Sequence, residues 1–110
     1  IAYSNEVKTD QLSVNEKTIE KFGAVSEQTA AEMAIGVKKL FSTDVGVSTT
    51  GIAGPSGGTK EKPVGLVYCG ISINDKTLTF KNNFKSDRKI NKMITSQVVL
   101  NIIRKELTKI

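Results

Sequence analysis

The sequence predicts an α/β domain in which helices and a mixed sheet stack as α/β/α layers. Three observations support this fold class. The predicted order is a strand, helices, a strand, a hairpin and a helix, a mix that is typical of layered α/β domains. The two-residue turn Asn74-Asp75 separates two of these β segments, as in a hairpin, so part of the sheet is antiparallel. The 110 residues fit one domain, 1–110.

Short segments open the chain. Residues 1–4 predict the end of a strand, and Asn5 then caps a helix that runs to about Leu12. Ser13 and Glu16 have the spacing of a capping box, in which Ser13 caps a second short helix and Glu16 reaches back to it. Gly23 ends this helix, because glycine adopts positive φ most readily.

The third predicted helix begins after Ser26, its N-cap, and lasts to about Phe41. Its apolar stripe follows the i, i+3, i+4, i+7 rule. The stripe contains Ala30, Met33, Ala34, Val37 and Leu40. Because several of these side chains are small, we expect this helix to pack closely on a sheet.

The predicted sheet follows. Residues 45–50 predict a buried strand, and a glycine-rich loop occupies residues 51–63. Residues 64–73 and 77–84 form the predicted hairpin. A last helix begins at Ser86-Asp87, and its many apolar residues predict that it is well buried. These residues are Ile90, Met93, Ile94, Val98, Leu100, Ile102, Ile103 and Leu107.

Composition excludes several kinds of chemistry. The chain has one cysteine and no histidine, which excludes a Ser-His-Asp triad within it and argues against a zinc site. We therefore expect no metal and no cofactor. Cys69 lies in an apolar run, which favours a buried, inert thiol. Hydrolysis would have to use Lys, Tyr, Ser, Thr or a carboxylate.

Charge is unevenly distributed. The net charge is +5, but residues 1–34 carry six acids and three lysines, so the excess of bases lies in residues 35–110. This basic part could be an ordinary solvated lysine surface, or it could attract a small anionic ligand. Its lysines are scattered and only two arginines occur, a pattern that does not favour a nucleic-acid face. No apolar run approaches the roughly 18 residues of a membrane span. We expect a cytoplasmic protein that does not bind membranes.

Three features could carry chemistry, and each has an ordinary alternative. The glycine-rich loop offers free backbone N–H groups to an anion, or is simply a long connection. Tyr3 and Lys8 flank the first strand-to-helix turn, where Lys8 could act as a base if it is desolvated, or be a solvated helix lysine. Arg88 opposes the helix dipole in the first turn of the last helix, which a bound phosphate or a neighbouring acid would explain.

Five segments, in this order, resemble the CinA C-terminal domain family over essentially the whole chain. They are Ala-Tyr-Ser-Asn-Glu-Val-Lys at 2–8, Gly-Ala-Val-Ser at 23–26, Thr-Gly-Ile-Ala-Gly-Pro-Ser-Gly-Gly-Thr at 50–59, Lys-Pro-Val-Gly-Leu-Val-Tyr at 62–68 and Asp-Arg at 87–88. The family includes bacterial nicotinamide-nucleotide amidohydrolases. The resemblance implies hydrolysis of the carboxamide of nicotinamide mononucleotide to nicotinate mononucleotide and ammonia.

The resemblance also implies roles for particular residues. Lys8 would be the base that activates a nucleophilic serine, and Tyr3 would lie in the same site. The residues implied to bind the nucleotide substrate are Thr50, Gly51, Ala53, Gly54 and Arg88. No metal takes part in this Ser-Lys mechanism.

One departure from the family pattern concerns the nucleophile. In the family the serine belongs to an Ala-Glu-Ser-Cys-Thr-Gly-Gly motif before the tyrosine segment, and no such motif occurs in these residues. We expect an N-terminally truncated domain that lacks its first strand and helix and is inactive alone. Without them, apolar surface of the helices at 30–40 and 90–102 would be exposed, which would favour a homo-oligomer. The alternative is a non-catalytic nucleotide-binding or interaction domain.

Overall fold

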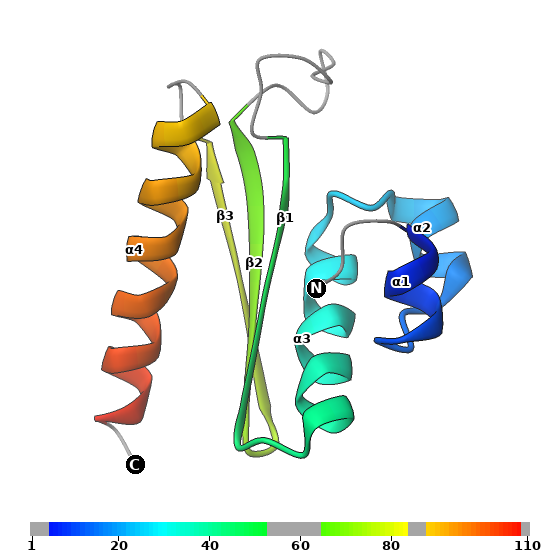
Figure 1. Cartoon of the computed structure of the whole chain (residues 1–110), viewed down its shortest axis with the longest axis horizontal. Helices are drawn as coiled ribbons and strands as arrows, with labels where there is room; N and C mark the ends of the chain where they lie inside the picture. Colours follow the sequence, from blue (N-terminus) through cyan, green and yellow to red (C-terminus); the bar gives the residue numbers. More distant parts are fainter. Residues whose placement is uncertain (1–4, 53–64, 84–87, 109–110) are drawn as a thin grey trace. The chain divides into compact units, whose positions relative to one another are not determined.

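The computed structural model describes residues 5–52, 65–83 and 88–108 (Figure 1). The predicted strand at 1–4 and most of the glycine-rich loop lie outside them. The elements are α1 (Asn5–Asp10), α2 (Glu16–Phe22), α3 (Glu27–Phe41), β1 (Val45–Gly51), β2 (Leu66–Ile73), β3 (Lys76–Asn83) and α4 (Arg88–Leu107). They divide into two compact units, Ile1–Thr50 with Tyr68–Lys81, and Gly51–Val67 with Asn82–Ile110.

The three strands form an antiparallel sheet in the order β1-β2-β3. The Ile52 N–H donates to the Leu66 carbonyl at 2.9 Å, and Gly65 N–H donates back to Ile52, which sets the pairing of β1 with β2. Asn74 takes a positive φ of 53° in the turn that joins β2 to β3. The predicted α/β class and hairpin are confirmed, whereas the predicted mixed sheet has no parallel pair among the strands described.

Helix α3 packs closely on the sheet, as its small residues predict. Ala30 and Ala34 are fully buried. A Cβ atom on Gly70 of β2 would lie 2.3 Å from the Ala30 carbonyl oxygen, and one on Gly46 of β1 would lie 2.2 Å from that of Ala34. Ser48 of β1 also donates its hydroxyl hydrogen to the Ala30 carbonyl. The two layers therefore touch backbone to backbone, which only glycine in the strands allows.

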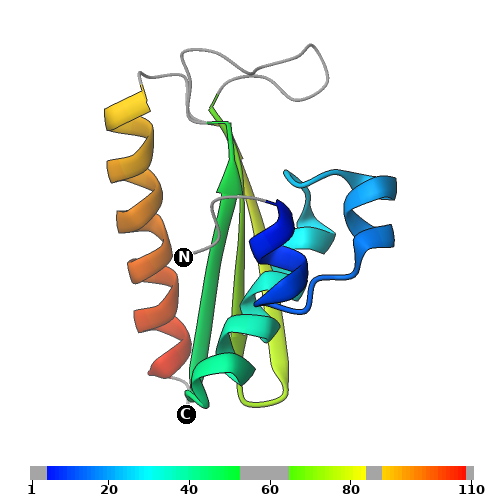
Figure 2. The same ribbon diagram turned by 45° about the vertical axis from the view of Figure 1, so that its right-hand side comes forward.

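The opposite side of α3 carries the short helices. A Cβ atom on Gly36 would lie 1.8 Å from the carbonyl oxygen of Leu12, so the α1–α2 connection also contacts the α3 backbone. Leu12, Val14 and Met33 form a buried cluster there, with Ile19 of α2 packed against it. Figure 1 shows α1 and α2 beside α3, on the side away from the strands, and in Figure 2 this side is turned forward.

The capping of α2 differs from the prediction. Asn15, not Ser13, is the N-cap, and its side chain accepts from the Lys17 N–H at 2.9 Å. Ser13 instead adopts a φ of 57° in the turn after α1, which allows Leu12 and Val14 on either side of it to be buried. The carboxylate that accepts from the Asn15 N–H belongs to Glu32 of α3, at 2.9 Å, rather than to Glu16. The predicted capping box is wrong because a tertiary contact supplies its acid.

The caps predicted at Gly23 and Ser26 are confirmed. Gly23 ends α2 with a φ of 87°, and the Ser26 side chain accepts from the Thr29 N–H at 3.2 Å to begin α3. Cys69 is buried as predicted, and burial raises the pKa of its thiol to about 11.

Helix α4 lies in the part of the sequence where a last helix is predicted, but the prediction that this helix is well buried is wrong. Met93, Leu100 and Leu107 are 56%, 66% and 48% exposed. They are seven residues apart and share one face, whereas the buried Thr95 and Val99 lie on another. Apolar residues distributed around a helix cannot all be covered from one side. No helix in the described part of the chain is long and apolar enough to cross a membrane.

Substituting Gly70 tests the close packing of α3. The added methyl of Gly70→Ala meets the Ala30 carbonyl, and we expect the free energy of unfolding to fall by about 1–3 kcal/mol. Thr77→Ala, on the exposed part of β3, is the control and should change it by less than about 0.5 kcal/mol. Urea unfolding measures both. Equal stability of the two variants would contradict the close contact.

Candidate functional site

Lys8 is a buried lysine on the short helix α1. Only 6% of its surface is exposed. Its carbonyl accepts from the Val14 N–H at 2.9 Å, which ties it to the buried Leu12–Val14 turn. Since burial removes water from the ammonium group, it lowers the pKa of Lys8. The alternative of a solvated helix lysine is therefore wrong.

The position of Lys8 follows from the local sequence. Leu12 lies four residues later, and the chain keeps a helical turn there because the N–H groups of Gln11 and Leu12 both donate to Val7. Residues four apart share a helix face, so the face that buries Leu12 also carries Lys8 toward the protein interior. A lysine that can lose its proton more easily is a possible general base.

Thr50 and Gly51 occupy the end of β1. Thr50 is buried, and its hydroxyl donates to the Ala24 carbonyl at 2.7 Å, so its hydrogen is already used within the protein. A Cβ atom on Gly51 would lie 2.7 Å from the Leu66 carbonyl oxygen. The neighbouring strand therefore leaves room only for glycine at position 51, independently of any role of this residue in binding a substrate.

The turn before α3 is held by a set of hydroxyl groups. Thr29 donates to the Gly23 carbonyl at 2.8 Å, and the Ser26 hydroxyl lies 2.9 Å from the same oxygen. Together with Thr50 on Ala24, these contacts fix two successive carbonyls of the turn. No local pattern of the sequence indicated Ala24 or Thr29 as part of this turn. The one signal for Thr29 was a hydroxyl group just before the apolar stripe of α3.

The other predicted site residues are only partly placed. Tyr3, Ala53 and Gly54 lie outside the described residues. Arg88 lies in the first turn of α4, as predicted, and its side chain is not among those described. Lys8 and Thr50 belong to the same compact unit, and Gly51 and Arg88 belong to the other. Within the described ranges, no group of three or more His, Cys, Asp or Glu residues could hold a metal ion.

Comparison with known proteins decides the family. The sequence profile of the CinA C-terminal domain matches residues 1–107. The chain belongs to the CinA C-terminal domain family. A relative from Clostridioides difficile, named a competence-damage inducible protein, is 53% identical over the whole chain, and one from Halothermothrix orenii with the same name is 59% identical over 88% of it. These matches cover 26% and 24% of the relatives, so the chain spans about a quarter of their length.

Solved structures of this family have the same fold. A competence/damage inducible protein from Agrobacterium tumefaciens superposes with a TM-score of 0.89 at 36% identity, covering 94% of this chain and 64% of that one. A CinA superfamily protein from Klebsiella pneumoniae gives a TM-score of 0.93 at 26% identity, covering 98% and 68%. The α/β fold and the family are therefore shown.

Thr50 variants test the hydrogen bond that holds the turn before α3. Thr50→Val keeps the shape of the side chain but leaves the Ala24 carbonyl without its donor, and we expect a loss of about 1–3 kcal/mol in the free energy of unfolding. Thr50→Ser retains a hydroxyl and should recover most of this loss. Thermal unfolding of the two variants measures the difference, and equal melting temperatures would contradict a stabilising role for the hydroxyl.

Proposed function

We propose that this domain, within the complete protein, hydrolyses the carboxamide of nicotinamide mononucleotide to nicotinate mononucleotide and ammonia. The observation that carries the proposal is the burial of Lys8, with its lowered pKa, in the segment that resembles the family's Tyr-Ser-Asn-x-x-Lys motif. An ordinary surface lysine would stay protonated near neutral pH, whereas a desolvated one can accept a proton.

In the proposed reaction, a serine encoded before Ile1 attacks the carboxamide carbon, and neutral Lys8 takes the hydroxyl proton. The tetrahedral intermediate collapses when Lys8 passes this proton to the leaving nitrogen, which departs as ammonia and leaves an acyl-enzyme. Lys8 then deprotonates a water molecule, which attacks the ester. The serine leaves with the proton, and nicotinate mononucleotide is released.

The remaining residues contribute to binding in this proposal. Gly51, Ala53 and Gly54 would let the substrate approach the backbone, with Tyr3 beside the reacting group and Arg88 on the phosphate. The Thr50 hydroxyl donates to the Ala24 carbonyl, which supports an indirect role for Thr50 in this proposal. Thr50 would shape the pocket by holding the turn, and its oxygen could only accept a hydrogen bond from the substrate.

Two further predictions accompany the proposed function. A homo-oligomer stays a prediction, supported by the exposed apolar face of Met93, Leu100 and Leu107 on α4. Cytoplasmic localisation also stays a prediction.

A second candidate function is a non-catalytic nucleotide-binding or interaction domain. It would apply to a gene that encodes no Ala-Glu-Ser-Cys-Thr-Gly-Gly segment before Ile1. Reading the gene upstream of the Ile1 codon separates the two. An in-frame segment of this kind supports the enzyme, and a gene without it supports the binding domain.

Lys8→Met tests the proposed base in the complete protein. Methionine keeps much of the aliphatic stem and removes the amine, so we expect kcat on nicotinamide mononucleotide to fall by about 100-fold or more with little change in KM. The wild-type rate should rise with pH as Lys8 loses its proton. Because burial lowers the Lys8 pKa, this rise should come at lower pH than an exposed lysine would give.

Lys17→Met is the matched control, since Lys17 is an exposed lysine of the neighbouring helix α2. It should retain the wild-type rate and pH profile. An undiminished kcat in a folded Lys8→Met protein would rule out the Ser-Lys assignment.

A further inference from the structure

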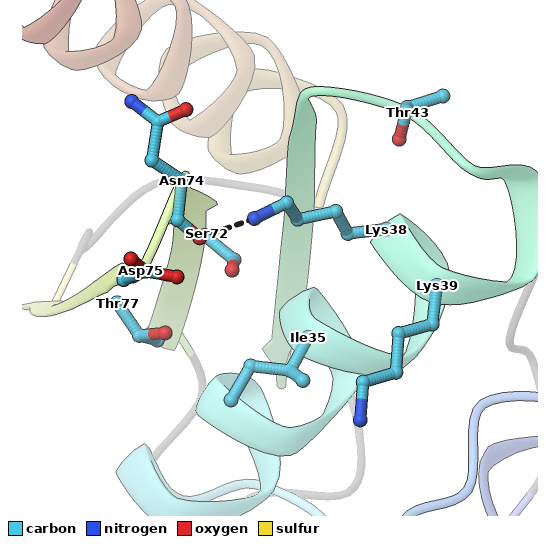
Figure 3. Close-up of a pocket in the computed structure, with 8 residues that line it drawn as sticks. All are labelled: Ile35, Lys38, Lys39, Thr43, Ser72, Asn74, Asp75 and Thr77. Carbon is cyan, nitrogen blue, oxygen red and sulfur yellow. Dashed lines mark hydrogen bonds between the residues drawn. The ribbon is translucent and has the colours of Figure 1, made fainter.

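A cavity of about 380 Å³ lies between the C-terminal half of α3 and the β2–β3 hairpin, within a single compact unit. Its volume is in the range of small-molecule sites. Neither Lys8, Thr50 nor Gly51 lines it, so it is separate from the candidate site described above. The lining residues that matter here are Ile35, Lys38, Lys39, Ser72, Asp75 and Thr77 (Figure 3).

Charges of opposite sign face this cavity from opposite walls. The lysines come from α3, and Asp75 comes from the turn of the hairpin. Lys38 reaches across to the hairpin, as Figure 3 shows, but its ammonium donates to the carbonyl oxygen of Asn74 rather than to the Asp75 carboxylate. Among the described residues, neither lysine forms an ion pair with Asp75. Both kinds of charge are therefore available to a ligand.

The other lining groups complement a small organic molecule. Ser72 and Thr77 present hydroxyl groups on the hairpin side, and the partly exposed Ile35 presents an apolar surface on the α3 side. A ligand that satisfies this cavity needs an anionic group for the lysines, a cationic donor for Asp75 and a short apolar part against Ile35.

We propose that this cavity binds a small zwitterion of the amino-acid class, with its carboxylate on the α3 lysines and its ammonium on Asp75. The Lys38 ammonium donates to the Asn74 carbonyl and so links α3 to the hairpin. Its other N–H donors are left for the carboxylate of the ligand. Because Lys39, Asp75 and Thr77 are exposed, each ion pair is screened by water, and we expect dissociation constants of about 1 mM.

The test uses three matched ligands on the complete protein, measured by saturation-transfer NMR below neutral pH. L-leucine carries both charges, N-acetyl-L-leucine lacks the ammonium, and L-leucinamide lacks the carboxylate. We expect L-leucine to bind more tightly than each derivative by up to about 5-fold, since each derivative loses one exposed ion pair. Equal binding of all three, or no binding of L-leucine at about 10 mM, would overturn the proposal.

Variants locate the binding to this cavity. Asp75→Asn should abolish the preference for L-leucine over N-acetyl-L-leucine, and Lys39→Met should reduce the preference over L-leucinamide. Lys17→Met, on α2, should leave both preferences unchanged. These are exposed side chains, so the fold should tolerate their substitution. Preferences that survive in both Asp75→Asn and Lys39→Met would place the binding elsewhere and overturn the assignment.

Discussion

The close contact of α3 with its neighbours on both sides is the constraint on which the rest of this unit depends. On the sheet side, the carbonyls of Ala30 and Ala34 approach strand glycines at distances that exclude any Cβ atom. On the other side, Gly36 admits the Leu12 carbonyl. The helix therefore contacts backbone on both of these faces, and this fixes its distance from each more tightly than larger side chains would.

Lys8 is buried although its helix has only six residues. Helix α1 is too short to be stable alone, and the chain directly after it is held against Met33 of α3 by Leu12 and Val14. The Lys8 carbonyl accepts from the Val14 N–H, which ties the backbone of α1 to this cluster. Burial of the Lys8 side chain lowers its pKa.

Much of the fold could be predicted from the sequence, because the strongest local patterns agree with the tertiary structure. In the predicted stripe of α3 the two alanines pack as predicted, whereas Leu40 is 45% exposed. The Ser26 cap and the Asn74-Asp75 turn have the predicted roles. The cap of α2 could not be predicted, since its acid partner, Glu32, comes from another helix. The face of α4 that stays exposed, which includes Leu100, could not be predicted because an apolar residue in a sequence does not show which face of a helix is covered.

The candidate site was less predictable than the fold. Spacing alone could not distinguish a buried Lys8 from a solvated one, because the exposure of a side chain depends on the tertiary structure around it. The hydrogen bond from Thr50 to Ala24 joins residues 26 positions apart, so no local pattern could indicate it. The resemblance to the CinA C-terminal domain family identified the segments that contain Lys8 and Thr50. The structure then distinguished their roles, because Lys8 is a buried amine and Thr50 holds a turn through its hydroxyl.

The lowered pKa of Lys8, which would let it act as a base, can be measured by an NMR titration of its side-chain amine in the complete protein, with the Lys8 signal assigned by the Lys8→Met substitution. We expect this amine to titrate below the range that is usual for exposed lysines, because burial lowers the Lys8 pKa. Titration of Lys8 within that usual range would contradict its role as a base.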